Sequence, residues 1–201
     1  MFPMIPIAPS GDDAGGDRLL NRDEIRKSAH TCFPSVFISA EICEKLYYEL
    51  FESFAEDIGF KVCVAIGSHG PAGVLIRKIA GENPLLKGMR IINAGSLSHN
   101  LDLVKTEYER LGISRISHGG MWESAMLMAS NPEFVDPEKL RNAVPGAYEK
   151  YMFEKHGMET VPTYEEIKKV SLEFGEQLVQ TAAERIAGEA NKALKEMGSN
   201  Q

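Results

Sequence analysis

The amino-acid sequence predicts an α/β fold with a mostly parallel central sheet. Two apolar runs rich in β-branched residues, 61–66 and 90–94, are typical of parallel strands that are buried on both faces. Each run is followed by a helical pattern, and this alternation implies a sheet with helices on both sides. A chain of 201 residues, 43% hydrophobic and 25% charged, is long enough for one domain with a sizeable core.

Composition also excludes several classes of protein. The formal net charge of −7 argues against nucleic-acid and anionic-membrane partners. No run approaches the roughly 18–20 apolar residues that a bilayer-spanning helix needs, and residues 1–7 lack the basic start of a signal peptide. The three cysteines, Cys32, Cys43 and Cys63, have no paired spacing and are expected to be free thiols. We therefore expect a cytoplasmic protein.

The N-terminal segment combines a short edge strand with an acidic loop. Residues 4–8 are apolar but interrupted by proline, which restricts them to the edge of a sheet. The glycine-rich loop at 11–17 is either a solvated surface loop or a source of oxygen ligands for a divalent metal, from Asp12, Asp13 or Asp17.

A helix is predicted between Ser39, a good N-cap, and Gly59, which ends it. The apolar residues Ile42, Leu46, Leu50 and Phe54 recur every four positions along one face of this helix. Tyr47 and Phe51 lie beside that face. The strand at 61–66 then leads into a glycine-rich turn with His69 and a helix at 74–80. This order places a site at the carboxyl edge of an open sheet. The turn is not a phosphate loop, because it lacks that motif's lysine.

The second half of the chain continues with the strand at 90–94, a helix at 102–111 closed by Gly112, and a weaker strand at 113–116. After Pro132 the chain is expected to be irregular.

Thr163 and Glu166 have the spacing of a capping box and predict a long helix. One face of this helix carries apolar residues at four-residue spacing: Val170, Phe174, Leu178, Ala182, Ile186, Ala190 and Leu194. We expect the face to pack against the sheet or a neighbouring subunit.

The segment 117–128 contains the strongest candidate for a site. His118 is expected in a tight turn at a helix N-terminus, and Gly119 and Gly120 allow a backbone to approach a ligand closely. Glu123 lies about one turn inside the helix, so that a catalytic acid/base pair is one interpretation. A histidine that is only structural is the other. Trp122 either packs under the site or forms a wall for a flat substrate.

The polar turns of a parallel sheet converge on one crevice. The acidic loop, His69 and His118 with Glu123 would then meet there. Histidines and carboxylates at one edge suit a divalent metal, which generates a nucleophile from bound water near neutral pH.

Segments in this order resemble the creatininase (creatinine amidohydrolase) family. The most specific is His118-Gly119-Gly120-Met121-Trp122-Glu123-Ser124-Ala125-Met126-Leu127-Met128, similar to the family's His-Gly/Ala-Gly-x-x-Glu-Thr/Ser-Ser/Ala-x-Met-Leu. Further similarity lies in residues 28–35, 67–73, 131–135 and 163–175. The resemblance covers roughly residues 28–190, and implies a three-layer α/β/α sandwich. The chain then reads as one creatininase-like domain over 1–201, with a divergent segment at 1–27 and a long helix at 163–197.

The resemblance also implies an activity. Family members are commonly homo-oligomers, often hexamers, and use Zn, Mn or Fe to hydrolyse non-peptide C–N bonds of small amides or cyclic amides. By position, His69 would be a metal ligand, His118 the acid/base and Glu123 a neighbouring site carboxylate. Gly119, Gly120 and Trp122 would contact the substrate.

One family motif is missing. The first strand of the family normally ends in Glu-x-His-Gly-Pro-His-Leu-Pro, which supplies most metal ligands, whereas residues 6–13 read Pro-Ile-Ala-Pro-Ser-Gly-Asp-Asp. Either Asp12, Asp13 or Asp17 replaces those ligands in an active hydrolase, or the chain binds no metal and is a binding or assembly subunit. A third alternative is that the start of the chain lies within the family domain.

Overall fold

The structure is a computed structural model that describes residues 19, 21, 23, 38–67, 70–95, 99–114, 116–117, 119–142 and 162–198. They separate into two compact units. The first unit contains the described residues up to Gly95 and from Ile186 onward, and the second unit those between. The predicted edge strand at 4–8 and the acidic loop at 11–17 lie outside the described residues.

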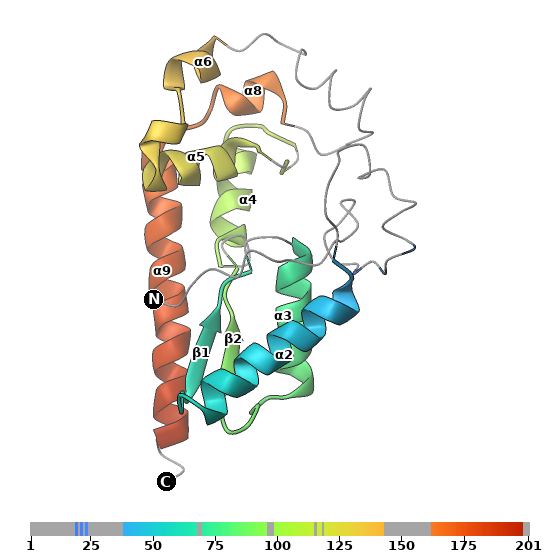
Figure 1. Cartoon of the computed structure of the whole chain (residues 1–201). Coiled ribbons are helices and arrows are strands. Elements are labelled where there is room, and N and C mark those ends of the chain that lie inside the picture. Colours follow the sequence, from blue (N-terminus) through green and yellow to red (C-terminus); the bar gives the residue numbers. More distant parts are fainter. Residues whose placement is uncertain are drawn as a thin grey trace. The chain divides into compact units, whose positions relative to one another are not determined.

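The first unit contains two parallel strands joined by a helix. Its elements in chain order are α2 (Ala40–Glu56), β1 (Val62–Ala65), α3 (Gly70–Glu82) and β2 (Arg90–Asn93) (Figure 1). The strands pair in parallel, from Val62 opposite Arg90 to Ala65 opposite Asn93. This confirms that the two apolar runs are adjacent parallel strands. Helix α3 packs against β2, and α2 packs against α3.

The prediction that both strands are buried on both faces is wrong for β1. Val64 is 37% exposed, and Ile66, just beyond the strand, is 69% exposed, whereas Ile91 and Ile92 of β2 are buried. A run of apolar β-branched residues indicates a preference for burial, but the fraction of its surface that is buried depends on which other elements pack against the strand.

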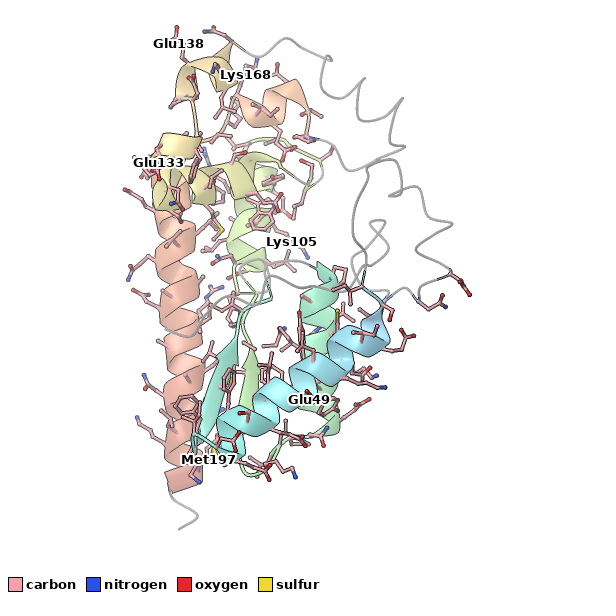
Figure 2. The ribbon with its side chains drawn as sticks, viewed as in Figure 1. Glu49, Lys105, Glu133, Glu138, Lys168 and Met197 are labelled. Atoms are coloured by element: carbon pink, nitrogen blue, oxygen red, sulfur yellow. The ribbon has the colours of Figure 1, made fainter. Side chains whose placement is uncertain are left out.

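Helix α2 begins after Ser39 and ends before Gly59, whose φ of +82° a glycine adopts without strain. Its buried stripe is only partly the one predicted, because Leu46 and Phe54 are half-buried and pack against the edge of the core. Cys43, Tyr47 and Phe51 face the core, whereas Ile42 is 58% exposed. Adjacent residues differ by 100° around a helix, so two neighbouring apolar stripes compete for the same core. Exposed charged side chains such as Glu49 cover the outer face (Figure 2).

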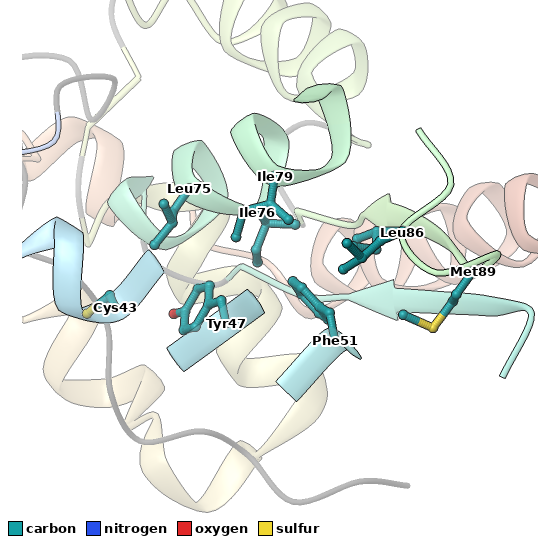
Figure 3. Close-up of a cluster of buried hydrophobic side chains, with 9 residues drawn as sticks. Cys43, Tyr47, Phe51, Leu75, Ile76, Ile79, Leu86 and Met89 are labelled. Atoms are coloured by element: carbon teal, nitrogen blue, oxygen red, sulfur yellow. The ribbon is translucent and has the colours of Figure 1, made fainter. Parts of the chain in front are cut away.

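The core of the first unit lies where α2, α3 and the start of β2 meet (Figure 3). Its buried members are Cys43, Tyr47, Phe51, Leu75, Ile76, Ile79, Leu86, Met89 and Ile91. Removing a side chain of this size from water contributes roughly 1.5–3 kcal/mol, so this cluster supplies much of the unit's stability.

The second unit is mainly helical in its described part. Its elements are α4 (Leu101–Arg110), α5 (Met121–Ser130), the 3₁₀ helix η2 (Pro132–Phe134), α6 (Pro137–Arg141), α8 (Tyr164–Ile167) and the first half of α9 (Leu172–Gly198). Helix α4 ends before Gly112 (φ +70°), as predicted. The predicted strand at 113–116 is absent from its described residues. Residues 132–142, predicted to be irregular, contain the two short helices η2 and α6, while residues 143–161 lie outside the described part of the chain.

The long helix predicted from residue 163 is divided in two. Helix α8 stops after four residues, and α9 starts at Leu172, where the Ser171 Oγ accepts a hydrogen bond from the Phe174 N–H (3.1 Å). Ser171 therefore provides a second N-cap that the sequence pattern did not reveal.

The predicted apolar stripe of α9 is confirmed only at its start. Phe174, Leu178 and Ala182 are buried, but Leu194 is 49% exposed while its neighbour Ala193 is buried. A spacing of four exceeds the 3.6 residues of one helical turn, so the stripe rotates by about 40° at each step. Ile186 and Ala190 are half-buried, and at Leu194, five steps after Phe174, the stripe has left the buried face.

Helices α9 and α4 are linked within the second unit by a bidentate ion pair. Arg185 donates to both carboxylate oxygens of Asp102, at 2.6 and 2.8 Å. The hydrogen bond from Arg185 lowers the pKa of Asp102 to about 2. The ion pair therefore stabilises the folded state at pH values above the ordinary pKa of an aspartate, and this stabilisation is lost as the pH falls towards 2. Because both side chains are exposed, the stabilisation is small.

Among the described helices, none combines the length and the apolar character that a membrane-spanning segment requires.

Candidate active site

The chain enters helix α5 through a turn that contains the strongest sequence motif. Gly119 has a φ of +64°, which favours glycine, and Gly120 is the N-cap in extended conformation. Helix α5 begins at Met121, so Glu123 lies in its first turn. This is the predicted arrangement of the segment. Because Gly120 has no side chain, the helix start has no cap of its own.

A carboxylate from another helix provides that cap. Glu166 of α8 is fully buried, and its Oε1 accepts a hydrogen bond from the Met121 N–H (3.0 Å). Oε1 also accepts from the Tyr108 hydroxyl of α4, while Oε2 accepts from Ser117 Oγ at 2.5 Å. A buried carboxylate destabilises a fold unless such donors compensate it. Here three donors from separate parts of the second unit do so.

The hydroxyl of Tyr108 is held in its protonated form. Burial raises the pKa of Tyr108 far above its usual value, and the hydrogen bond and negative charge of Glu166 raise it further. The phenol therefore remains a hydrogen-bond donor at neutral and moderately alkaline pH.

A second set of hydrogen bonds closes the same turn. The Gly119 N–H donates to Glu123 Oε2, and Ser124 Oγ donates to the Gly119 carbonyl (3.2 Å). Ser117 and Gly119, the two residues that flank His118 in sequence, are thus both anchored by side chains. Glu123 is half-buried, and one of its carboxylate oxygens, Oε2, stabilises the turn.

Gly120 is required for a steric reason. A Cβ at this position would lie 2.0 Å from Glu166 Oε1 and 2.4 Å from Ser117 Oγ. The close neighbour of this glycine is therefore the buried carboxylate. Contact of Gly119 and Gly120 with a substrate stays a prediction.

Trp122 packs into the core of the second unit. It is 7% exposed, and its buried Nε1 has no hydrogen-bond partner among the described residues. Its cluster consists of Val104, Tyr108, Met121, Trp122, Ala125, Phe174 and Leu178. This placement agrees with a tryptophan that packs under the turn, and its role as a wall for substrate stays a prediction.

Four predicted site residues, His118, His69, Asp12 and Asp13, lie outside the described residues. Their meeting at one crevice therefore stays a prediction. Near His69 the described chain is tight, because a Cβ on Gly67 would lie 2.7 Å from the Cα of Gly73. Among the described residues, no three His, Cys, Asp or Glu side chains gather as a metal site would require. A metal would need ligands from outside them.

Sequence reasoning missed Glu166 as part of the site. The capping box did mark it, and the Thr163 Oγ1 accepts from the Glu166 N–H (3.1 Å) as that motif predicts. The Glu166 side chain, however, points into the protein and caps α5. No local pattern identifies Tyr108 or Ser117 as its partners.

Comparison with known proteins decides the family. The family model for creatinine amidohydrolase matches residues 26–198, most of the chain. The chain belongs to the creatininase family. A crystal structure of creatinine amidohydrolase (creatininase) is similar with a TM-score of 0.56 at 17% identity, and the match covers 83% of this chain and 68% of that chain. At this identity the similarity shows the fold alone. No curated protein sequence gives a significant match.

Creatininase-family membership confirms the resemblance predicted from residues 118–128. The described residues agree with a creatininase-like fold that contains a small parallel sheet, while the complete three-layer sandwich stays a prediction. The turn that Glu166 anchors is the same segment in which the resemblance to the family is most specific.

Proposed function

We propose that the protein hydrolyses a C–N bond of a small amide or cyclic amide. The observation that carries this proposal is the turn from Ser117 to Met121, whose two ends bind one buried carboxylate. A catalytic side chain needs a fixed backbone, because small displacements of the reacting groups lower the rate steeply. The described residues on either side of His118, Ser117 and Gly119, are held by side-chain hydrogen bonds, and we assign the catalytic side chain to His118 between them.

His118 is assigned the role of general acid. An amide nitrogen leaves as a poor leaving group unless it is protonated, and a histidine near its ordinary pKa can donate that proton at neutral pH. Glu123, which accepts a hydrogen bond from the Gly119 N–H, is assigned the role of the neighbouring site carboxylate. Gly119, Gly120 and Trp122 are kept as proposed substrate contacts.

The proposal includes a divalent ion, Zn, Mn or Fe, with His69, Asp12 and Asp13 as ligands. The described residues do not themselves contain a set of three ligands, so we assign no reaction step to the ion. We further propose that the protein is a homo-oligomer, that it is located in the cytoplasm, and that its substrate is a small-molecule amide.

A binding or assembly subunit without hydrolase activity is the second candidate. Two observations favour it: residues 6–13 lack the family's Glu-x-His-Gly-Pro-His-Leu-Pro motif, and the carboxylate of Glu123 closes the turn by accepting from the Gly119 N–H. In this case the turn held by Glu166 would have a structural role only.

Metal analysis of the purified protein separates the two candidates. An active hydrolase should retain about one Zn, Mn or Fe ion per chain after dialysis, and His69→Ala should lose it. His156→Ala, at a histidine without a supporting motif, is the matched control and should keep the ion. Absence of metal in the wild-type protein after supplementation would contradict the hydrolase and favour the binding subunit.

A further inference from the structure

Glu166 does more than a local cap would need to do. Asp, Ser or Asn at position 120 would satisfy the start of helix α5 from within the turn. The chain instead has a glycine there and uses a carboxylate 45 residues away along the sequence. This carboxylate also binds Tyr108 of α4 and Ser117, so that α4, α8 and the turn share a single acceptor.

The placement of the turn therefore depends on Glu166. Its two oxygens bind Ser117 and Met121, one residue before His118 and three residues after it. The glycine at position 120 allows this close approach, since a Cβ there would lie 2.0 Å from Glu166 Oε1 and 2.4 Å from Ser117 Oγ.

We propose that Glu166 is a positioning residue that fixes the backbone on both sides of His118. It acts together with the Tyr108 hydroxyl, which holds the carboxylate in place from α4. The proposal rests on the proposed function only for its consequence in catalysis. The positioning itself can be measured without any substrate.

Three variants test the positioning. Glu166→Ala removes both acceptor oxygens. Glu166→Gln keeps Oε1, which accepts from Tyr108 and Met121, and the Ser117 hydroxyl can rotate to accept from the new amide. Glu165→Gln is the matched control, because Glu165 is an exposed neighbour whose partner is Lys168 on the surface (2.6 Å; Lys168 is labelled in Figure 2).

Two NMR readouts are compared in these variants. In Glu166→Ala, the Met121 amide should exchange with solvent about tenfold faster, and the imidazole signals of His118, assigned with His118→Ala, should shift. Glu166→Gln should restore most of the wild-type signals, and Glu165→Gln should leave them unchanged. Faster exchange at Met121 with unchanged His118 signals would overturn the proposal, because Glu166 would then only stabilise the helix.

A milder variant covers the case in which Glu166→Ala does not fold. Tyr108→Phe removes one donor and keeps the ring in its cluster, so it should shift the His118 signals in the same direction by less. No shift in this variant would likewise count against the proposal.

Activity separates this proposal from the proposed function. If the wild-type protein hydrolyses an amide, Glu166→Ala should lower kcat with little change in KM, and Glu165→Gln should change neither. If no amide is hydrolysed, the NMR readouts still decide whether Glu166 positions the turn.

Discussion

Replacing Gly175 by alanine is expected to destabilise the second unit by about 3 kcal/mol. The added Cβ would lie 2.0 Å from the carbonyl oxygen of Ala125 and 2.6 Å from its carbonyl carbon. Both are backbone atoms of α5, which cannot rotate away as the end of a side chain can. Helices α9 and α5 would have to separate and expose the cluster around Leu178. Denaturant unfolding followed by circular dichroism measures the loss.

Gly188→Ala, in the same helix, is the matched control. Among the described residues, no atom outside the helix's own nearby backbone lies within 4 Å of a Cβ at that position, so alanine should stabilise the helix by roughly 0.5–1 kcal/mol. If Gly175→Ala were as stable as Gly188→Ala, α9 and α5 would not pack as closely as the structure has them.

Replacing Gly120 by alanine is expected to have a similar effect, about 3 kcal/mol. Its φ of −78° suits any residue, so backbone strain makes no contribution. The loss arises because the Cβ would displace Glu166 Oε1 and Ser117 Oγ, which lie 2.0 and 2.4 Å from it. The buried carboxylate would then lack its partners. Thermal and denaturant unfolding measure the effect.

A double-mutant cycle with Glu166→Ala identifies the cause. Without the carboxylate, most of the space that the Cβ needs is free, so Gly120→Ala should destabilise the Glu166→Ala protein much less than the wild type. Additive losses would mean that Gly120 and Glu166 do not share this space.

Local rules of sequence identified much of the fold. Ser39 and Gly59 delimit α2, Gly112 ends α4, and the two β-branched runs are the paired strands. These features depend on neighbours in sequence. Which stripe of α2 is most deeply buried, and how far Val64 is covered, depend on distant elements, and the predicted burial of Ile42 and Val64 is wrong.

The candidate site shows the same division. The histidine and glycine motif located the turn and placed Glu123 in the first turn of α5. It could not identify Glu166, because the spacing of Thr163 and Glu166 has a complete local explanation as a capping box. In a capping box the Glu166 side chain would bind the start of its own helix, α8; here it binds the start of α5 instead.

Hydrolysis of a panel of small linear and cyclic amides tests the proposed function most directly. The wild-type protein is assayed with Zn, Mn or Fe beside His118→Ala and the control His156→Ala. We expect the wild type and His156→Ala to release amine from at least one amide, and His118→Ala to be slower by about 100-fold or more. Equal rates in His118→Ala and wild type, or no release with any metal, would contradict it.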